Sequence, residues 1–83
     1  MTVAEQVKKF IVSNFYVSDP AAIADDTSLI TEGYVDSTGM LEIIAFLEKE
    51  FRIRVVDQET IPDNLETIGR IAAFVCRKQA SGA

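Results

Sequence analysis

The sequence contains no histidine and only one cysteine among its 83 residues. A single cysteine cannot close a disulfide within the chain, so the sequence carries no sign of an oxidising compartment. No segment approaches the roughly 20 apolar residues that a membrane-spanning helix needs, and the amphipathic start does not resemble a signal peptide. We therefore expect a cytoplasmic protein without membrane insertion.

Basic residues are also scarce, with 8 lysines and arginines against 13 aspartates and glutamates, which gives a net charge of −5. Nucleic-acid binding draws its affinity from cations that displace counterions, so this balance argues against DNA or RNA as a partner. It argues equally against anionic membranes and favours proteins with basic surfaces. Since 48% of the residues are hydrophobic, we expect one small domain, 1–83, with a single core.

Apolar residues recur at helical spacing in three segments of the sequence. The expected main helices cover about 3–15, 37–51 and 67–77. Thr2 and Glu5 fit a capping box at the start of the first helix, in which each side chain accepts a hydrogen bond from the backbone of the other residue. Each helix is expected to turn its apolar stripe toward a shared core.

The segments between these helices lack long periodic patterns. Residues 16–36 contain Asp-Pro, Asp-Asp-Thr-Ser and a glycine, which predict a loop that is long for a compact domain. Residues 57–65 predict a short helix, whereas 52–56 alternates like a strand but has no partner strand with which to form a sheet. The sequence therefore predicts an all-α fold, a small four-helix bundle of three main helices and one short helix.

The stretch from Thr31 to Phe51, TEGYVDSTGMLEIIAFLEKEF, resembles the core motif of acyl carrier proteins. In that family a Gly-x-x-Asp-Ser segment opens the second helix, and Gly33, Asp36 and Ser37 match it. The Asp-Ser pair alone is a weak signal, because both residue types favour helix caps. Its position after a long loop, at the start of an amphipathic helix, strengthens the resemblance, which extends in length and pattern over nearly the whole chain.

The resemblance implies that Ser37 carries 4′-phosphopantetheine, which a separate phosphopantetheinyl transferase takes from coenzyme A. A serine hydroxyl needs a neighbouring base to become a good nucleophile, and the chain has no histidine for that role. The resemblance also implies that Asp36 assists by binding the Mg²⁺ of the transferase; alone it is not a metal site. The chain would then hold acyl or aminoacyl groups as thioesters and would not itself be an enzyme.

Four residues of the second expected helix are candidates for partner contact. Glu42 and Glu48 could meet basic patches on partner enzymes, or they could be ordinary solvated charges. Leu41 falls at the edge of the apolar face and is a candidate for exposed apolar contact, while Met40 falls on the core side. The partners implied by the resemblance are acyl- or aminoacyl-adenylating ligases, synthases and acyltransferases. We expect a monomer.

Several residues depart from the usual family pattern. Thr38 replaces the usual leucine and Gly39 an acidic residue, and a glycine costs up to about 1 kcal/mol in a helix, which predicts a looser first turn. Arg52 and Arg54 add cations to a connector that is usually acidic in housekeeping carriers; we interpret them as solvating it, with an acidic ligand as the alternative. The segment VDQETIPDNLETI looks like that of specialised carriers serving adenylating ligases. We therefore expect lipid or specialised-metabolite biosynthesis.

An alternative hypothesis needs no modification of the chain. Asp36 and Ser37 would then act only as a helix cap, and the protein would be an acidic helical adaptor. It would bind a partner protein through Glu42 and Glu48. The two hypotheses differ in whether function depends on the hydroxyl of Ser37.

Overall fold

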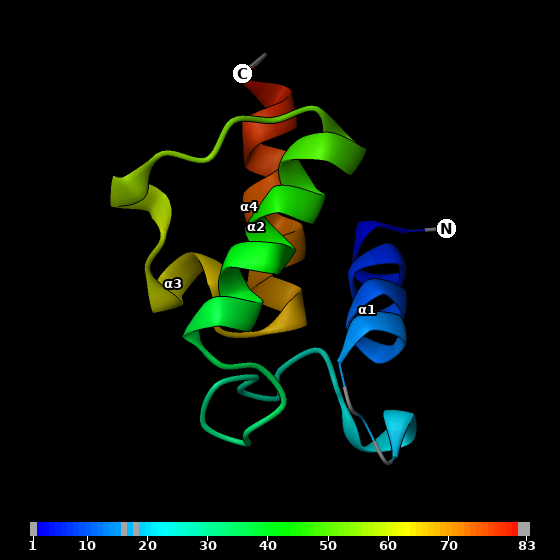
Figure 1. Ribbon diagram of the computed structural model, residues 1–83. Helices are drawn as coiled ribbons and strands as arrows, with labels where there is room; N and C mark the ends of the chain where they lie inside the picture. Colours follow the sequence, from blue (N-terminus) through cyan, green and yellow to red (C-terminus); the bar gives the residue numbers. More distant parts are fainter. Residues whose placement is uncertain (1, 16, 18, 82–83) are drawn as a thin grey trace.

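A computed structural model describes residues 2–15, 17 and 19–81 of the chain. In chain order, its elements are α1 (Val3–Asn14), a 3₁₀ turn (Pro20–Ala22), α2 (Ser37–Phe51), a second 3₁₀ turn (Asp57–Glu59), α3 (Pro62–Leu65) and α4 (Ile68–Ala80). The described residues form no β-strand, so the predicted all-α class with three main helices and a short one is confirmed. In Figure 1, α1 and α3 lie on opposite sides of α2 and α4.

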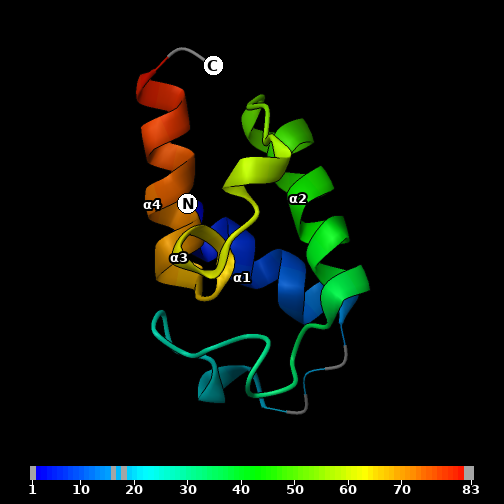
Figure 2. The same cartoon turned by 90° about the vertical axis from the view of Figure 1, so that its left-hand side faces the viewer.

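The last helix is the centre of the packing. Both α1 and α3 lie against α4, and α2 contacts α1 and α4. Figure 2 is viewed from the side of α3, which lies in front of the first turn of α4. Among the helices that the structure describes, none has the length and apolar character to cross a membrane.

The ends of the helices differ slightly from the expected ones. Phe15 is extended (φ −121°, ψ 156°), so α1 ends at Asn14. The last helix begins after Thr67, whose hydroxyl accepts a hydrogen bond from the Arg70 amide at 3.0 Å. It continues past the expected end at 77, where the cations Arg77 and Lys78 suit the negative end of the helix dipole. The short helix expected within 57–65 is two separate turns.

One apolar core lies between the helices and is closed by the connecting segments. Its buried members are Val7, Ile11, Ile23, Leu29, Val35, Ile43, Leu47, Ile53, Leu65, Ile68, Ile71, Phe74 and Val75. Three of them, Ile23, Leu29 and Val35, belong to the long segment between α1 and α2. This segment is therefore anchored by apolar burial although it contains almost no regular structure.

Backbone hydrogen bonds tie the same long segment to the start of α4. The Leu29 amide donates to the Glu66 carbonyl at 2.9 Å, and the Gly69 amide donates to the Asp25 carbonyl at 2.8 Å. A Cβ on Gly69 would lie 3.1 Å from that carbonyl oxygen, which explains the small residue there. Gly33 has a φ of 80°, a left-handed conformation that glycine adopts readily. The loop expected over 16–36 includes Tyr16 and Ser18, which lie outside the described residues.

The second 3₁₀ turn is joined to α4 by a pair of charges. The Glu59 carboxylate accepts hydrogen bonds from Lys78 Nζ at 3.0 and 3.1 Å and from the Val56 amide at 3.0 Å. These donors stabilise the charged carboxylate and lower the pKa of Glu59, the Val56 amide having the larger effect and Lys78 the next. The connector after α2 is thus held to α4 from its far end.

Candidate functional site

Ser37 is the first residue of α2, and its side chain is exposed. Asp36 precedes it with an extended backbone (φ −101°, ψ −174°), and its Oδ1 accepts a hydrogen bond from the Gly39 amide at 2.7 Å. The Asp36 carbonyl accepts the first helical hydrogen bond, from the Met40 amide at 2.9 Å. Asp36 is therefore the N-cap of the helix, and it holds Ser37 at the first position of α2.

The first two amides of α2 have no hydrogen-bond acceptor within the described part of the chain. They belong to Ser37 and Thr38, both of which are exposed. Unpaired amides at a helix N-terminus, together with the positive end of the helix dipole, favour a bound anion such as a phosphate group. An anionic group on the oxygen of Ser37 would meet these donors directly.

Ser37 also lines a groove of about 480 Å³ between α2 and the segment around α3. Most of the groove wall is apolar, including Ile30, Met40, Leu41, Ile44, Ile61 and Leu65. Ile30 and Ile61 are 46% and 42% exposed, which is high for side chains of this size in a small domain. The groove can therefore accommodate an elongated, largely apolar molecule that begins at the Ser37 oxygen.

The candidate contact residues occupy different positions around this site. Met40 is half-buried and Leu41 is 66% exposed, and both line the groove beside Ser37. Glu42 is exposed on the outer side of α2. Glu48 is half-buried and lies farther along the helix, where its Oε2 accepts a hydrogen bond from the Val55 amide at 3.0 Å. One oxygen of this carboxylate thus holds the connector that follows α2.

The opposite wall of the groove was not identified from the sequence. It comes from the segment around Ile61, Pro62 and Leu65, which is distant from Ser37 along the chain. The sequence signal for this wall is Ile61 followed by Pro62, because an apolar side chain in so short an element is rarely buried completely. Only the way α3 packs on α4 brings this segment opposite α2.

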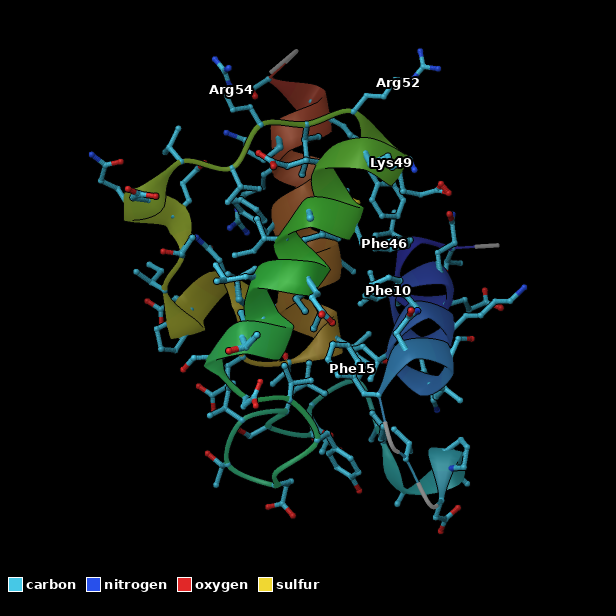
Figure 3. The ribbon with its side chains drawn as sticks, in the orientation of Figure 1. Phe10, Phe15, Phe46, Lys49, Arg52 and Arg54 are labelled. Atoms are coloured by element: carbon cyan, nitrogen blue, oxygen red, sulfur yellow. The ribbon has the colours of Figure 1, made fainter. Side chains whose placement is uncertain are left out.

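Gly39 is buried beneath the first turn of α2 and not loosely exposed there. A Cβ at this position would lie 2.6 Å from Cε1 of Phe15 and 3.1 Å from Cγ1 of Val35. The ring of Phe15 contacts that of Phe10 edge-on, with 6.2 Å between the ring centroids, and Phe10 stacks on Phe46 with 4.2 Å between the centroids (Figure 3). The sequence predicts that Gly39 loosens the first turn of α2. Instead, its lack of a side chain allows Phe15, at the end of α1, to pack directly against this turn.

No protein-family model matches the chain. Among curated proteins, it is 28% identical over 78 residues to "Acyl carrier protein AcpP" of Rhizobium meliloti (strain 1021), covering 94% of this chain and 96% of that protein. It is equally similar, over the same shares, to "Acyl carrier protein" of Sinorhizobium fredii (strain NBRC 101917 / NGR234). With "Acyl carrier protein" of Rhodococcus erythropolis (strain PR4 / NBRC 100887) it shares 29% identity over 65 residues, 78% of this chain and 69% of that protein.

These relatives are carrier proteins by name, and the alignments to the first two span almost their entire length. The small all-α fold agrees with that class of protein. The chain is therefore similar to acyl carrier proteins over almost its whole length, the same family that the segment from Thr31 to Phe51 resembles.

Proposed function

We propose that this protein carries acyl groups as thioesters on a 4′-phosphopantetheine arm attached to Ser37. The observation that carries the proposal is the exposed hydroxyl of Ser37 at the first residue of α2, at the edge of an apolar groove. A transferase can reach a hydroxyl in this position without any unfolding of the chain. Similarity to acyl carrier proteins over 94% of the chain supports the same role.

The residues around Ser37 fit such an arm. The unpaired amides of Ser37 and Thr38 suit the phosphate, and the apolar wall with Met40 and Leu41 suits the chain beyond it. When attached, the arm supplies a terminal thiol that forms thioesters with acyl cargo. The protein's own residues orient the arm and shield its inner part from water.

Attachment requires a separate enzyme because the chain offers no base beside Ser37. The serine oxygen attacks a phosphorus atom of coenzyme A, the nucleotide part departs, and the proton passes to a base of the transferase. We assign to Asp36 a share in binding the Mg²⁺ of that enzyme. Its Oδ1 caps the Gly39 amide, while its Oδ2 accepts no hydrogen bond in the described part of the chain.

Partners of this kind would bind along the outer face of α2. Leu41 and Met40 supply apolar surface beside the arm, and Glu42 supplies an exposed carboxylate on the same helix. Glu48 contributes through the one oxygen that does not hold the Val55 amide. We propose an acyl- or aminoacyl-adenylating ligase as the loading enzyme, because the segment after Val56 resembles that of carriers that serve such ligases.

The test is the mass of the intact protein after incubation with a phosphopantetheinyl transferase and coenzyme A. We expect a gain of one arm for the native sequence and for Thr38→Ala, which removes the adjacent exposed hydroxyl as a matched control. We expect no gain for Ser37→Ala. A gain that survives Ser37→Ala, or no gain with the native sequence, contradicts the proposal.

Complementation in the native cells separates the carrier from the unmodified adaptor. Ser37→Ala should abolish function in the carrier, with circular dichroism confirming that the variant is folded. If Ser37→Ala retains function while Glu42→Lys loses it, the adaptor is correct. The mass of the protein purified from those cells would then identify the cargo on the arm.

A further inference from the structure

Three cations occur at the end of α2 that is remote from Ser37 and in the connector that follows it. Lys49 is in the last turn of the helix, and Arg52 and Arg54 stand on either side of the buried Ile53. All three are exposed, and in the described residues none of them forms an ion pair or a side-chain hydrogen bond. Figure 3 shows Lys49, Arg52 and Arg54 at the same end of the molecule, with the side chains of Arg52 and Arg54 directed to opposite sides of it. We call them the α2-end patch.

The two nearest carboxylates in the sequence do not neutralise this patch. Glu48 is half-buried and accepts a hydrogen bond from the Val55 amide. Glu50 lines a shallow hollow between α1 and α2, together with Phe10 and Phe46. At 100° per residue, Glu50 points about 100° away from Lys49 around the helix axis. The patch is therefore a local positive region on a protein whose net charge is −5.

The backbone conformation of Arg52 is unusual for an arginine. Arg52 terminates α2 in the left-handed conformation, with φ 55° and ψ 46°. Glycine adopts this conformation most easily, and it is the preferred residue at this position of a helix end. The left-handed conformation costs arginine backbone free energy, and within the described residues its guanidinium forms no ion pair or hydrogen bond. Its charge suits the negative end of the helix dipole, but that interaction does not require a residue in the left-handed conformation, so Arg52 is a candidate for function.

We propose that the α2-end patch binds an acidic surface of the protein partner that docks over Ser37. The proposal rests on the carrier function proposed above. Lys49 lies about 20° from Glu42 around the helix, so both face the same partner. Ser37 and Lys49 are about 18 Å apart along the helix at 1.5 Å per residue and about 120° apart around it, so the partner must extend over the outer side of α2 to reach both. An interface of about 800 Å² per partner is about 30 Å across and covers both.

Other anionic ligands fit the patch less well. A small anion would need an enclosing pocket, and none of the three residues lines the groove beside Ser37 or the hollow between α1 and α2. The negative charge of the whole protein opposes approach to polyanions such as nucleic acids and anionic membranes. A protein surface that bears carboxylates needs no pocket. Contacts near Ser37 already bring it close, so pairing at short range is sufficient despite the net negative charge.

The arrangement of charge along α2 also fixes how the partner binds. Asp36 and Glu42 are at the Ser37 end, and the α2-end patch is at the other. A partner therefore needs basic groups near its active-site entrance and acidic groups about 18 Å away. An enzyme that is basic along the whole docking face would meet like charges at Lys49 and Arg52. Such repulsion discriminates against partners that suit a uniformly acidic α2.

The decisive experiment compares acyl loading of two double charge-reversal variants. Arm-bearing protein is incubated with ATP and an extract of its native cells, and the rate of mass gain on the arm is measured. Arg52→Glu/Arg54→Glu should load about ten-fold more slowly than the native protein, because charge complementarity sets the rate of encounter. Lys8→Glu/Lys9→Glu on α1 changes the net charge equally and should load within about two-fold of native.

Arg52→Gly separates function from stability. It relieves the left-handed backbone, so we expect a higher denaturant midpoint together with slower loading. Salt near 1 M, where the Debye length is about 3 Å, should bring the native rate toward that of Arg52→Glu/Arg54→Glu.

Equal loading rates for the two double variants contradict the proposed role of the α2-end patch. So does a result in which the native protein and Lys8→Glu/Lys9→Glu bind phosphatidylserine vesicles and Arg52→Glu/Arg54→Glu does not, because the patch would then bind a membrane. Failure of Ser37 to accept the arm instead contradicts the carrier function.

Discussion

Gly39→Ala is expected to destabilise the protein, although alanine is the better helix former. In an exposed helix interior, replacing glycine with alanine gains up to about 1 kcal/mol of folding free energy. Gly39 is buried, however, and the new Cβ would lie 2.6 Å from Cε1 of Phe15, closer than carbon atoms can approach. The ring of Phe15 must therefore move, and its edge-on contact with Phe10 restricts how far it can go.

Two opposing free energies set the size of the effect. Overpacking a well-filled site costs about 1–3 kcal/mol, and the helix propensity of alanine returns at most about 1 kcal/mol. We therefore expect Gly39→Ala to lower the free energy of unfolding by about 1 kcal/mol. Phe15→Leu removes the atoms Cε1 and Cζ that the new methyl group would meet. In that background the same change should be neutral or stabilising, so the coupling between the two positions is about 2 kcal/mol.

Urea unfolding of the native protein, both single variants and the double variant gives this coupling directly. Ala45→Gly is the matched control, because Ala45 is exposed in the middle of the same helix. It should cost about 1 kcal/mol whether residue 15 is phenylalanine or leucine. If Gly39→Ala stabilises the protein equally in both backgrounds, Phe15 does not restrain the first turn of α2.

Three further predictions concern polar side chains that hold backbone segments. Asp36→Ala should lower the free energy of unfolding by about 1 kcal/mol in urea, because the helix loses its N-cap, whereas Asp36→Asn should preserve it. Glu48→Ala should cost about 1–2 kcal/mol by leaving the Val55 amide unpaired, and Glu48→Gln should cost less because it keeps an acceptor oxygen. The pKa of Glu59 is lowered by the Val56 amide and Lys78, so its stabilisation is present above its ordinary pKa of 4.5 and is lost as the pH falls through the lower pKa of the folded state. Glu59→Gln should therefore reduce the slope of stability against pH in acid, measured by urea unfolding; an unchanged slope would exclude this contribution.

The sequence predicts the fold class well because the signals that form the helices are local. Thr2 and Glu5 form the expected capping box, with both hydrogen bonds at 3.1 Å. The Thr67 hydroxyl caps α4, and the positive φ of Gly33 is the turn conformation that its sequence position allows. Each of these features depends on residues no more than a few positions apart. Helical periodicity then determines which faces must be buried.

Features that depend on contacts between distant segments could not be predicted in this way. In the last helix, apolar spacing predicts a buried stripe of Ile68, Ile71, Ala72 and Val75. In the structure Ala72 is only half-buried, whereas Phe74, outside that stripe, is 2% exposed. A wheel describes one helix, whereas burial on α4 also depends on α1 and α3. The groove beside Ser37 is non-local for the same reason, since one wall is Ile61 and its neighbours. Its existence follows only from the packing of α3.

Glu48 bears both on partner contact and on the rigidity of α2. Its position on α2 predicts a carboxylate free for a partner, but the structure commits one oxygen to the Val55 amide. This hydrogen bond holds the connector immediately after Arg52, while Asp36 holds the first turn at the opposite end of α2. Both ends of the helix are thus fixed by a side chain bonded to the backbone. This rigidity preserves the separation between Ser37 and the α2-end patch, which act on one partner. We therefore expect Glu48→Ala to load more slowly than the native protein even under conditions in which the variant is fully folded.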